Sequence, residues 1–242
     1  IRANKEWKVE VPKEYQSWLK AEALSETELK VTTTTTNNLM VNRVGHIIMK
    51  TKEVIDGFDG ITFDISQGTA FWKEGGADNY VVDEETGYMT LYGSGIVTNY
   101  LFKKGRLAFD FESINLTGED WIEFNMWPNS GNTNFHLHFY ANKESNFTCG
   151  GSGLNWTQKT FTWTSEQTNV VKKIEFLVVN KEEGSNALVL KLIIDGVEVA
   201  VLDNNITDPY ATEPGAPVYF RMHTTNKASN FTVKSITWEP VE

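Results

Sequence analysis

Four histidines occur in 242 residues, and two of them, His136 and His138, stand one residue apart in the run NFHLHFYANKE. Two imidazoles at this spacing lie on the same face of a β-strand, because alternate side chains of a strand point to opposite sides. Such a pair can hold a metal ion, act as a general base, or form part of a polar binding surface. The residues around the pair discriminate among these three uses.

The same alternation occurs in three aromatic-rich runs, WIEFNMW (121–127), NFHLHFYA (134–141) and VYFRMHTT (218–225). Each predicts a strand with one apolar face and one face of rings, amides and charges. If the three strands are neighbours, their polar faces form one patch. The predicted patch consists of Trp121, Glu123, Asn125, Trp127, His136, His138, Tyr140, Arg221 and His223.

This patch has the chemistry that a saccharide requires. Aromatic rings pack on the C–H face of a sugar ring, and planar polar groups can hydrogen-bond to neighbouring hydroxyls. The simpler explanation is that an antiparallel sheet has one solvated face. Solvated faces are usually rich in Lys, Glu and Thr, however, so the patch favours binding of a polysaccharide or oligosaccharide.

Metal binding is one alternative use of the histidines. His136 and His138, with Glu123 or His223 as a third ligand, have a spacing that suits zinc. The stretch 131–151 also approaches the metal motif of the cupins, although two gaps differ by a residue. No second cupin motif surrounds His223, so no metal ligands are assigned.

Catalysis is the other alternative. Jelly-roll polysaccharide lyases use a His or Tyr base together with an Arg or amide that neutralises the uronate carboxylate. Glycoside hydrolases usually use two carboxylates. The lyase signatures are missing, and Glu123 is the one carboxylate in the predicted patch. No catalytic residue is assigned, and a lyase or hydrolase that uses the same face as its active site is kept as the alternative function.

The composition excludes other classes. A net charge of −10 without a basic stripe disfavours nucleic acid as a partner. No apolar run approaches the ~18 residues of a membrane-spanning helix.

The single cysteine, Cys149 in FTCGGSG, is expected to be an unpaired thiol in or near a loop. No cofactor is predicted except a structural calcium ion, for which the acidic loops DEET (83–86) and TGED (117–120) offer carboxylates.

Short β-type runs with turn signals between them predict a nearly all-β chain of about thirteen strands. A helix is compatible with the sequence at YQSWLKAEA (15–23). Asp195–Gly196, between β-branched runs, predicts a two-residue hairpin, and Glu182–Asn186 predicts a polar hairpin. The chain is expected to divide near Gln67–Gly68, because nearly all Phe and most Trp residues follow that point.

Residues 1–67 carry an ordered set of short motifs. These are NKEW (4–7), SWLK (17–20), TTNN (35–38), NRVGHIIM (42–49) and ITFDISQ (61–67). Their order resembles the BACON domain, a small immunoglobulin-like sandwich common in secreted glycan-processing proteins of Bacteroidetes. The residues at the family's characteristic places are Trp7, Trp18, Leu19, Asn37, Arg43 and Gln67.

The resemblance implies a spacer module, and it implies one or two further strands before Trp7, so that residues 1–67 would be an N-terminally incomplete copy. Trp7 and Trp18 are expected to be core residues of this sandwich rather than sugar-binding residues.

Residues 68–242 contain about nine predicted strands with no helix between them, and such a chain must pack as two sheets. The pattern of residues 172–204 resembles the concanavalin A-like and laminin G-like jelly rolls, which implies carbohydrate binding. The expected architecture is therefore all-β: a small immunoglobulin-like β-sandwich followed by a larger concanavalin-like jelly-roll sandwich. The expected function is noncatalytic carbohydrate binding.

The two resemblances imply a secreted or cell-surface protein, located extracellularly or at the outer-membrane surface, with the periplasm left open. The chain begins at Ile1 without a signal-like region, so a targeting segment is expected to have been removed or to lie outside this sequence. A lipid anchor outside this sequence is left open.

Overall fold

The structure is a computed structural model, and it describes residues 6–69, 71–74, 80–93, 95–101, 104–118, 120–128, 134–151, 154–185, 187–207, 217–223 and 228–241. The chain forms two compact units. The first comprises residues 1–37 and 41–69, and the second comprises residues 38–40 and 70–242. The last residue of the first unit, Thr69, is close to the boundary expected at Gln67–Gly68.

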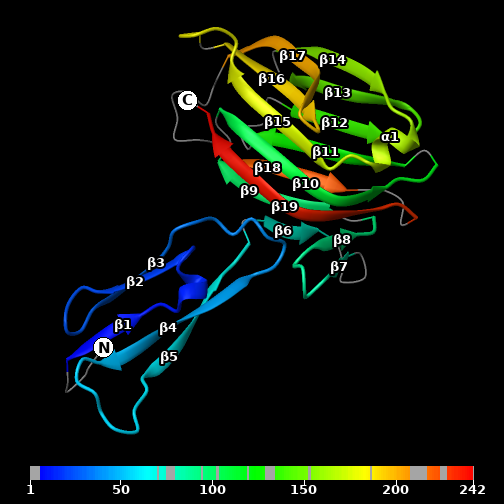
Figure 1. The fold of residues 1–242 in the computed structure, drawn as a ribbon. Coiled ribbons are helices and arrows are strands. Elements are labelled where there is room, and N and C mark those ends of the chain that lie inside the picture. The colour runs from blue at the N-terminus through cyan, green and yellow to red at the C-terminus, as the bar shows by residue number, and fades with distance from the viewer. Residues whose placement is uncertain are drawn as a thin grey trace. The chain divides into compact units, whose positions relative to one another are not determined.

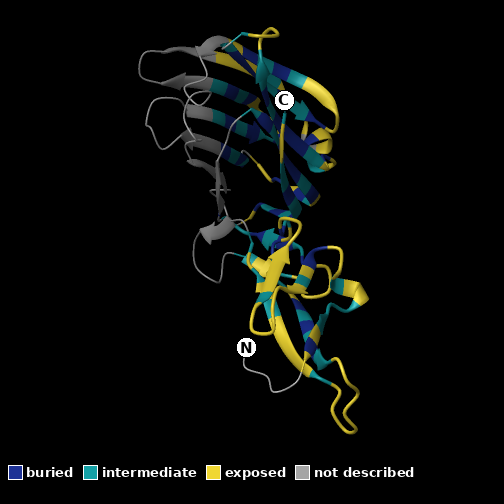
Figure 2. Ribbon diagram, turned by 90° about the vertical axis from the view of Figure 1, so that its left-hand side faces the viewer, coloured by how far each residue is buried: buried dark blue, intermediate teal, exposed yellow. Residues whose placement is uncertain are grey.

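The first unit is a small β-sandwich (Figure 1). Its elements are β1 (Trp7–Glu10), the 3-10 helix η1 (Lys13–Tyr15), β2 (Leu19–Ala23), β3 (Leu29–Thr33), β4 (Arg43–Thr51) and β5 (Ile61–Gln67). One antiparallel sheet has the order β1-β4-β5, and β2 pairs with β3 in the other. The buried core of this unit is small, and Figure 2 shows that much of its strand surface is exposed.

The helix that the sequence allowed at residues 15–23 is wrong, because η1 ends at Tyr15 and β2 begins at Leu19. The residues of this stretch have good helix propensity, but burial outweighs it. Trp18 is 7% exposed and Leu19 is 1% exposed. Trp18 packs on Gly45, where a Cβ atom would lie 2.8 Å from the indole ring. Trp7 is also 7% exposed, so the prediction that both tryptophans are core residues is confirmed.

Residues that carry the BACON resemblance lie together in the first unit. The Asn37 side-chain amide donates to the carbonyl oxygens of Val41 (2.8 Å) and Gln67 (3.2 Å). Arg43 Nε donates to Gln67 Oε1 at 2.6 Å, and its guanidinium lies 4.5 Å from the centroid of the Trp18 ring. These contacts join the start of β4 to the end of β5. The assignment of the unit to that family stays a prediction.

The second unit consists of two stacked, seven-stranded sheets (Figure 1). The β10 sheet has the order β17-β16-β15-β10-β19-β8-β7, and the β11 sheet has the order β14-β13-β12-β11-β18-β9-β6. The strands are β6 (Phe71–Glu74), β7 (Tyr80–Val82), β8 (Met89–Leu91), β9 (Gly95–Leu101), β10 (Gly105–Asn115), β11 (Trp121–Pro128), β12 (Asn134–Tyr140), β13 (Glu144–Gly151), β14 (Leu154–Thr162), β15 (Lys173–Asn180), β16 (Ala187–Ile194), β17 (Val197–Thr207), β18 (Pro217–His223) and β19 (Asn230–Pro240). The expected all-β fold class, with a small sandwich and a larger jelly-roll sandwich, is confirmed.

The core of the second unit lies between its two sheets. The ring of Phe109 on β10 lies 5.1 Å from that of Phe124 on β11, and the ring of Phe176 on β15 lies 5.3 Å from Phe124. Aromatic pairs at these separations add packing energy to the burial of their apolar area. The core therefore fixes which face of each sheet points outward.

Both predicted hairpins of the second unit are confirmed. Asp195 and Gly196 join β16 to β17 with φ values of 48° and 81°, as a type I′ turn requires. The Asp195 carboxylate accepts hydrogen bonds from the backbone amides of Lys172 (2.9 Å) and Lys173 (2.7 Å), which holds the aspartate in this left-handed conformation. β15 and β16 also pair as antiparallel neighbours up to Asn180 and Leu188, as the polar hairpin predicted between them requires, and Asn186 itself lies outside the described residues.

Three further expectations are corrected by the structure. The second unit contains a helix, α1 (Ser165–Asn169), which begins with a capping box between Thr164 and Gln167. The part of the chain that the structure describes has more strands than predicted, because β2, β6, β7, β9 and β13 were missed. The glycine-rich stretch that begins at Cys149 was expected to be a turn, but Cys149 belongs to β13, two residues before the strand ends at Gly151. None of the helices in the described residues is long and apolar enough to span a membrane.

Candidate functional site

The three strands that carry the predicted patch are neighbours in the β11 sheet, in the order β12-β11-β18. The sequence could not show this order, because it depends on how distant parts of the chain pair. The backbone partners are Glu123 with His138 and His223, Asn125 with His136 and Arg221, Trp121 with Tyr140, and Trp127 with Tyr219. The backbone therefore brings the nine predicted residues onto three adjacent strands.

Five of the nine predicted side chains are described, and all five lie on the outer face of the sheet, partly exposed. They are Trp121, Glu123, His136, His138 and Tyr140. The residues that alternate with them, Ile122, Phe124, Leu137 and Phe139, are 0–2% exposed in the core. The predicted alternation is thus confirmed for these residues. The side chains of Asn125, Trp127, Arg221 and His223 lie outside the described part of the structure.

A carboxylate lies between the two imidazoles of this face. Glu123 Oε1 is 2.9 Å from His136 Nε2 and 3.9 Å from His138 Nε2. The two imidazole rings have centroids 4.4 Å apart. The side chains of His136 and His138 are 28% and 29% exposed, and the Glu123 side chain is 14% exposed. The cluster is therefore partly shielded from solvent, so electrostatic interactions within it are screened less than on an open surface.

Aromatic rings continue the face on one side of this cluster. The Trp121 ring lies 6.0 Å from His138 and 5.4 Å from Tyr140, measured between centroids. Lys143 Nζ lies 5.2 Å from the centroid of the Tyr140 ring. The Trp121 indole nitrogen is buried, and it has no hydrogen-bond acceptor among the described residues. The rings form a continuous strip along β11 and β12.

Strand β13 extends the face with residues that sequence reasoning missed. Asn146 pairs with His138 in the backbone register and Thr148 pairs with His136, and both side chains are partly exposed. Gln158 Nε2 on β14 donates to Asn146 Oδ1 at 2.7 Å. This strand was not predicted, because its glycine-rich end, FTCGGSG, resembles a turn. The alternation of polar and apolar residues in SNFT (145–148) does indicate a strand. We call the surface formed by Trp121, Glu123, His136, His138, Tyr140, Asn146 and Thr148 the β11–β13 face.

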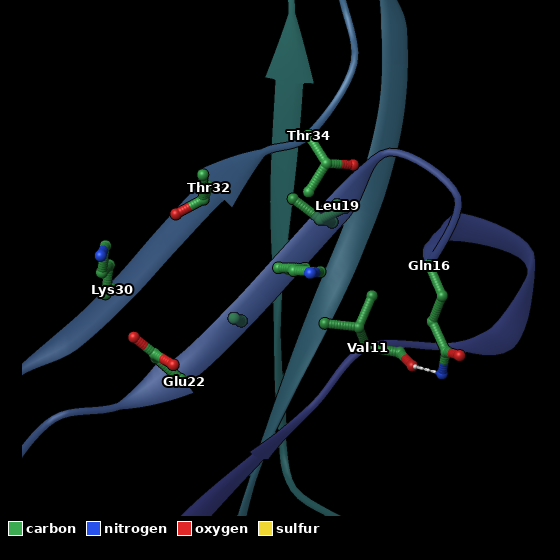
Figure 3. Close-up of a pocket in the computed structure, with 9 residues that line it drawn as sticks. Val11, Gln16, Leu19, Glu22, Lys30, Thr32 and Thr34 are labelled. Atoms are coloured by element: carbon green, nitrogen blue, oxygen red, sulfur yellow. Dashed lines mark hydrogen bonds between the residues drawn. The ribbon is translucent and has the colours of Figure 1, made fainter.

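A groove of about 620 Å³ lies elsewhere, in the first unit along β2 and β3. Figure 3 shows Lys30 and Thr32 on one side of β2 and Val11 and Gln16 on the other. Gln16 Nε2 donates to the Val11 carbonyl oxygen at 2.8 Å. Among the described residues, no aromatic side chain lines this groove, so it lacks rings on which sugars could stack.

The two acidic loops considered for calcium use their aspartates in hydrogen bonds. Asp83 accepts from the backbone and hydroxyl of Thr86 and from the backbone of Glu85, and these bonds lower the pKa of its carboxyl group. Asp120 accepts from the hydroxyl groups of Ser229 and Thr117. The hydrogen bonds of these two aspartates are explained by the local fold, and calcium binding stays a prediction.

No protein-family model matches the chain, and no curated protein matches it in sequence. Among solved structures, the chain is similar to a legume lectin-like domain from Entamoeba histolytica, with a TM-score of 0.49 and 10% identity over 72% of this chain and 91% of that one. It is similar to a Bacillus licheniformis β-glucanase, with a TM-score of 0.48 and 12% identity over 71% and 92%. Peanut lectin has a TM-score of 0.39 and 10% identity over 83% and 99%. At these scores the likenesses do not bear on which function the chain has.

Proposed function

We propose that this chain binds a polysaccharide or oligosaccharide, without cleaving it, on the β11–β13 face. One observation carries the proposal: rings, imidazoles, an amide and a carboxylate form a continuous, partly exposed strip over a completely buried core. Such a strip offers stacking surfaces for sugar rings and hydrogen-bonding groups for hydroxyls.

The strip is also preorganised. Its residues stand on paired strands, and their rings contact one another across the ladder rather than projecting singly into solvent. Three neighbouring strands span roughly 10 Å, since adjacent strands lie about 4.8 Å apart. A rigid platform of this width loses little conformational entropy when an extended ligand binds, which favours affinity.

A polysaccharide lyase or glycoside hydrolase with the same face as active site is the second candidate. The hydrogen-bonding distance of 2.9 Å between Glu123 and His136 supports it, because a carboxylate that orients an imidazole is typical of a general base. Against it, the cluster formed by Glu123, His136 and His138 contains one carboxylate, whereas glycoside hydrolysis usually uses two.

The first unit is proposed to be a BACON-like spacer of a Bacteroidetes surface protein, on the basis of the motifs in residues 1–67. This proposal places the protein outside the cell or at the outer-membrane surface, with the periplasm and a lipid anchor left open. Protease accessibility on intact cells that produce the protein tests the location: cleavage without cell lysis is expected, and full protection would contradict a surface location.

The binding proposal is tested by affinity electrophoresis against a panel of plant and host glycans, with release of reducing ends and of unsaturated products measured in parallel. The informative variant is Tyr140→Ala, which removes a ring of the β11–β13 face. Its matched control is Tyr88→Ala. Tyr88 is also a half-buried tyrosine with a lysine over its ring, Lys234 at 5.3 Å, but it precedes β8 of the β10 sheet.

Retardation by at least one glycan, weakened in Tyr140→Ala and retained in Tyr88→Ala, is the expected result. Product release that disappears in His138→Ala would replace the binding proposal with the enzymatic one. A panel that shows neither retardation nor product would overturn both.

A further inference from the structure

The cluster at the centre of the β11–β13 face has a property that sugar binding does not require. One oxygen of Glu123 and one nitrogen each of His136 and His138 all lie within 4.8 Å of one another. Two imidazoles and one carboxylate are the ligand set that borderline transition metals such as Zn²⁺ prefer.

We propose that Glu123, His136 and His138 bind a divalent transition-metal ion, with Zn²⁺ as the reference ion. In a tetrahedral site, ligand atoms at about 2.0–2.2 Å from zinc lie about 3.4 Å from one another. The distances from Glu123 Oε1 to the two imidazole nitrogens, 2.9 Å and 3.9 Å, lie on either side of this value. Each of these two distances differs from the tetrahedral value by about half an ångström, and the two imidazole nitrogens lie within 4.8 Å of each other.

The strands hold the three ligands in a fixed arrangement. Glu123 and His138 are direct backbone partners, and His136 lies two residues along the same strand as His138. Leu137 and Phe124, on the reverse side of these strands, are buried in the core. Because the ligands project from paired strands rather than from a loop, little conformational entropy is lost when they bind an ion.

The site faces outward, so three protein ligands leave a coordination position accessible to solvent. This arrangement differs from closed structural zinc sites, which have four protein ligands, and matches sites in which zinc exchanges small ligands. An oxygen of a bound molecule, including a sugar hydroxyl or carboxylate, is the chemistry that the open position accepts. The net charge of −10 of the whole chain also favours cation binding.

The inference does not depend on the proposed glycan binding, and it is tested with metal alone. Metal-free protein is titrated with Zn²⁺ by isothermal titration calorimetry without any glycan, and Ca²⁺ serves as the reference hard cation. Variants are Glu123→Gln, His136→Ala and His138→Ala. The matched control is His46→Ala, because His46 also lies near a carboxylate, Asp64 at 3.8 Å, but the sequence of the first unit holds no second histidine.

Binding of one Zn²⁺ per chain is expected, with Ca²⁺ much weaker because it prefers six to eight oxygen ligands. Loss of an outer-shell partner of a metal typically costs 10–100-fold in affinity, so loss of a direct ligand is expected to cost about 100-fold or more. His46→Ala is expected to retain wild-type affinity. Thermal unfolding without metal verifies that each variant folds. Unchanged Zn²⁺ affinity in folded His136→Ala and His138→Ala, or an equal loss in His46→Ala, would overturn the proposal.

Discussion

The two sheets of the second unit share one core but have different outer faces. On the β10 sheet, outward side chains join in ion pairs: Arg106 with Glu175 (2.8 Å), Lys191 with Glu198 (2.8 Å), Lys181 with Asp203 (2.9 Å) and Lys234 with Glu112 (3.3 Å). On the β11 sheet, the described outward side chains include a tryptophan, a tyrosine and two histidines around a single glutamate.

This difference separates what the fold requires from what a ligand requires. A sheet that covers a core needs only a soluble outer face, and the β10 sheet has the charged pattern typical of one. Rings and imidazoles on the outer face of the β11 sheet add nothing to that solubility. Substitutions on the two faces should therefore change different properties of the protein.

The largest effect on stability is expected for substitutions in the core that lies between the two sheets. Phe109→Ala removes a ring that contacts Phe124 and Phe176 in the core, and it should lower the free energy of unfolding by about 3–5 kcal/mol. Phe63→Ala in β5 of the first unit, where the ring is 44% exposed, should cost much less. Urea denaturation measures both, and a loss of less than about 1 kcal/mol for Phe109→Ala would show that the two sheets do not depend on this core.

On the outer face of the β10 sheet, one ion pair is expected to contribute more to the free energy of unfolding than the others. Glu175 is 4% exposed and pairs with Arg106, so Arg106→Ala leaves a buried carboxylate whose remaining ion-pair partner among the described residues is Lys173 at 3.4 Å. The expected loss is about 1–3 kcal/mol in the free energy of unfolding. Lys191→Ala breaks an exposed pair and should cost less than about 1 kcal/mol. Equal losses, measured by urea denaturation, would mean that burial of Glu175 has no energetic consequence.

On the outer face of the β11 sheet, the ring of Trp121 is expected to contribute to the free energy of unfolding, whereas its indole nitrogen is not. Trp121→Phe keeps an aromatic ring and removes an N–H that has no acceptor among the described residues, so the free energy of unfolding should change by less than about 1 kcal/mol. Trp7 supplies the contrast, because its indole nitrogen donates to the Glu26 carbonyl oxygen at 2.6 Å. Trp7→Phe should therefore cost about 1 kcal/mol more than Trp121→Phe. The reverse order of the two losses in thermal unfolding would contradict this assignment.

The smallest effect is expected for an exposed ion pair outside both faces. Contacts with Lys50 and then Lys8 lower the pKa of the exposed carboxyl group of Glu10 from 4.5 to about 2. Because the folded pKa is the lower one, the stabilisation is complete above pH 4.5 and disappears as the pH falls toward 2. Carboxyl-detected NMR should show Glu10 titrating near pH 2. Titration of Glu10 near pH 4.5 would mean that the two lysines do not lower its pKa. In Glu10→Gln, the loss of stability that Glu10 causes at acid pH should disappear.

The features that the sequence predicted well were those that depend on neighbouring residues. The Asp195–Gly196 hairpin follows from two residues that tolerate positive φ. The two faces of β11 and β12 follow from alternation along one strand. Helix α1 had a readable signal as well, the capping box from Thr164 to Gln167, but its five residues gave no apolar period to support it.

The features that the sequence could not predict depend on pairing between distant segments. The contact of Glu123 with His136 follows from the register between β11 and β12, and no local pattern specifies that register. The helix prediction at residues 15–23 failed because packing of Trp18 on Gly45 outweighed local propensity. Strand β13 was missed because glycines near Cys149 resemble a turn. Local alternation thus predicted which of the described residues face outward, but not which of them are in contact.

The central claim is that the β11–β13 face binds a glycan, and the four histidines offer its most direct test. Imidazole signals of labelled protein are followed by NMR during titration with the polysaccharide that retards the protein most strongly. The signals of His136 and His138 should shift in a saturable manner, while the signal of His46 in the first unit stays unchanged. Saturable binding that leaves His136 and His138 unshifted would contradict the claim.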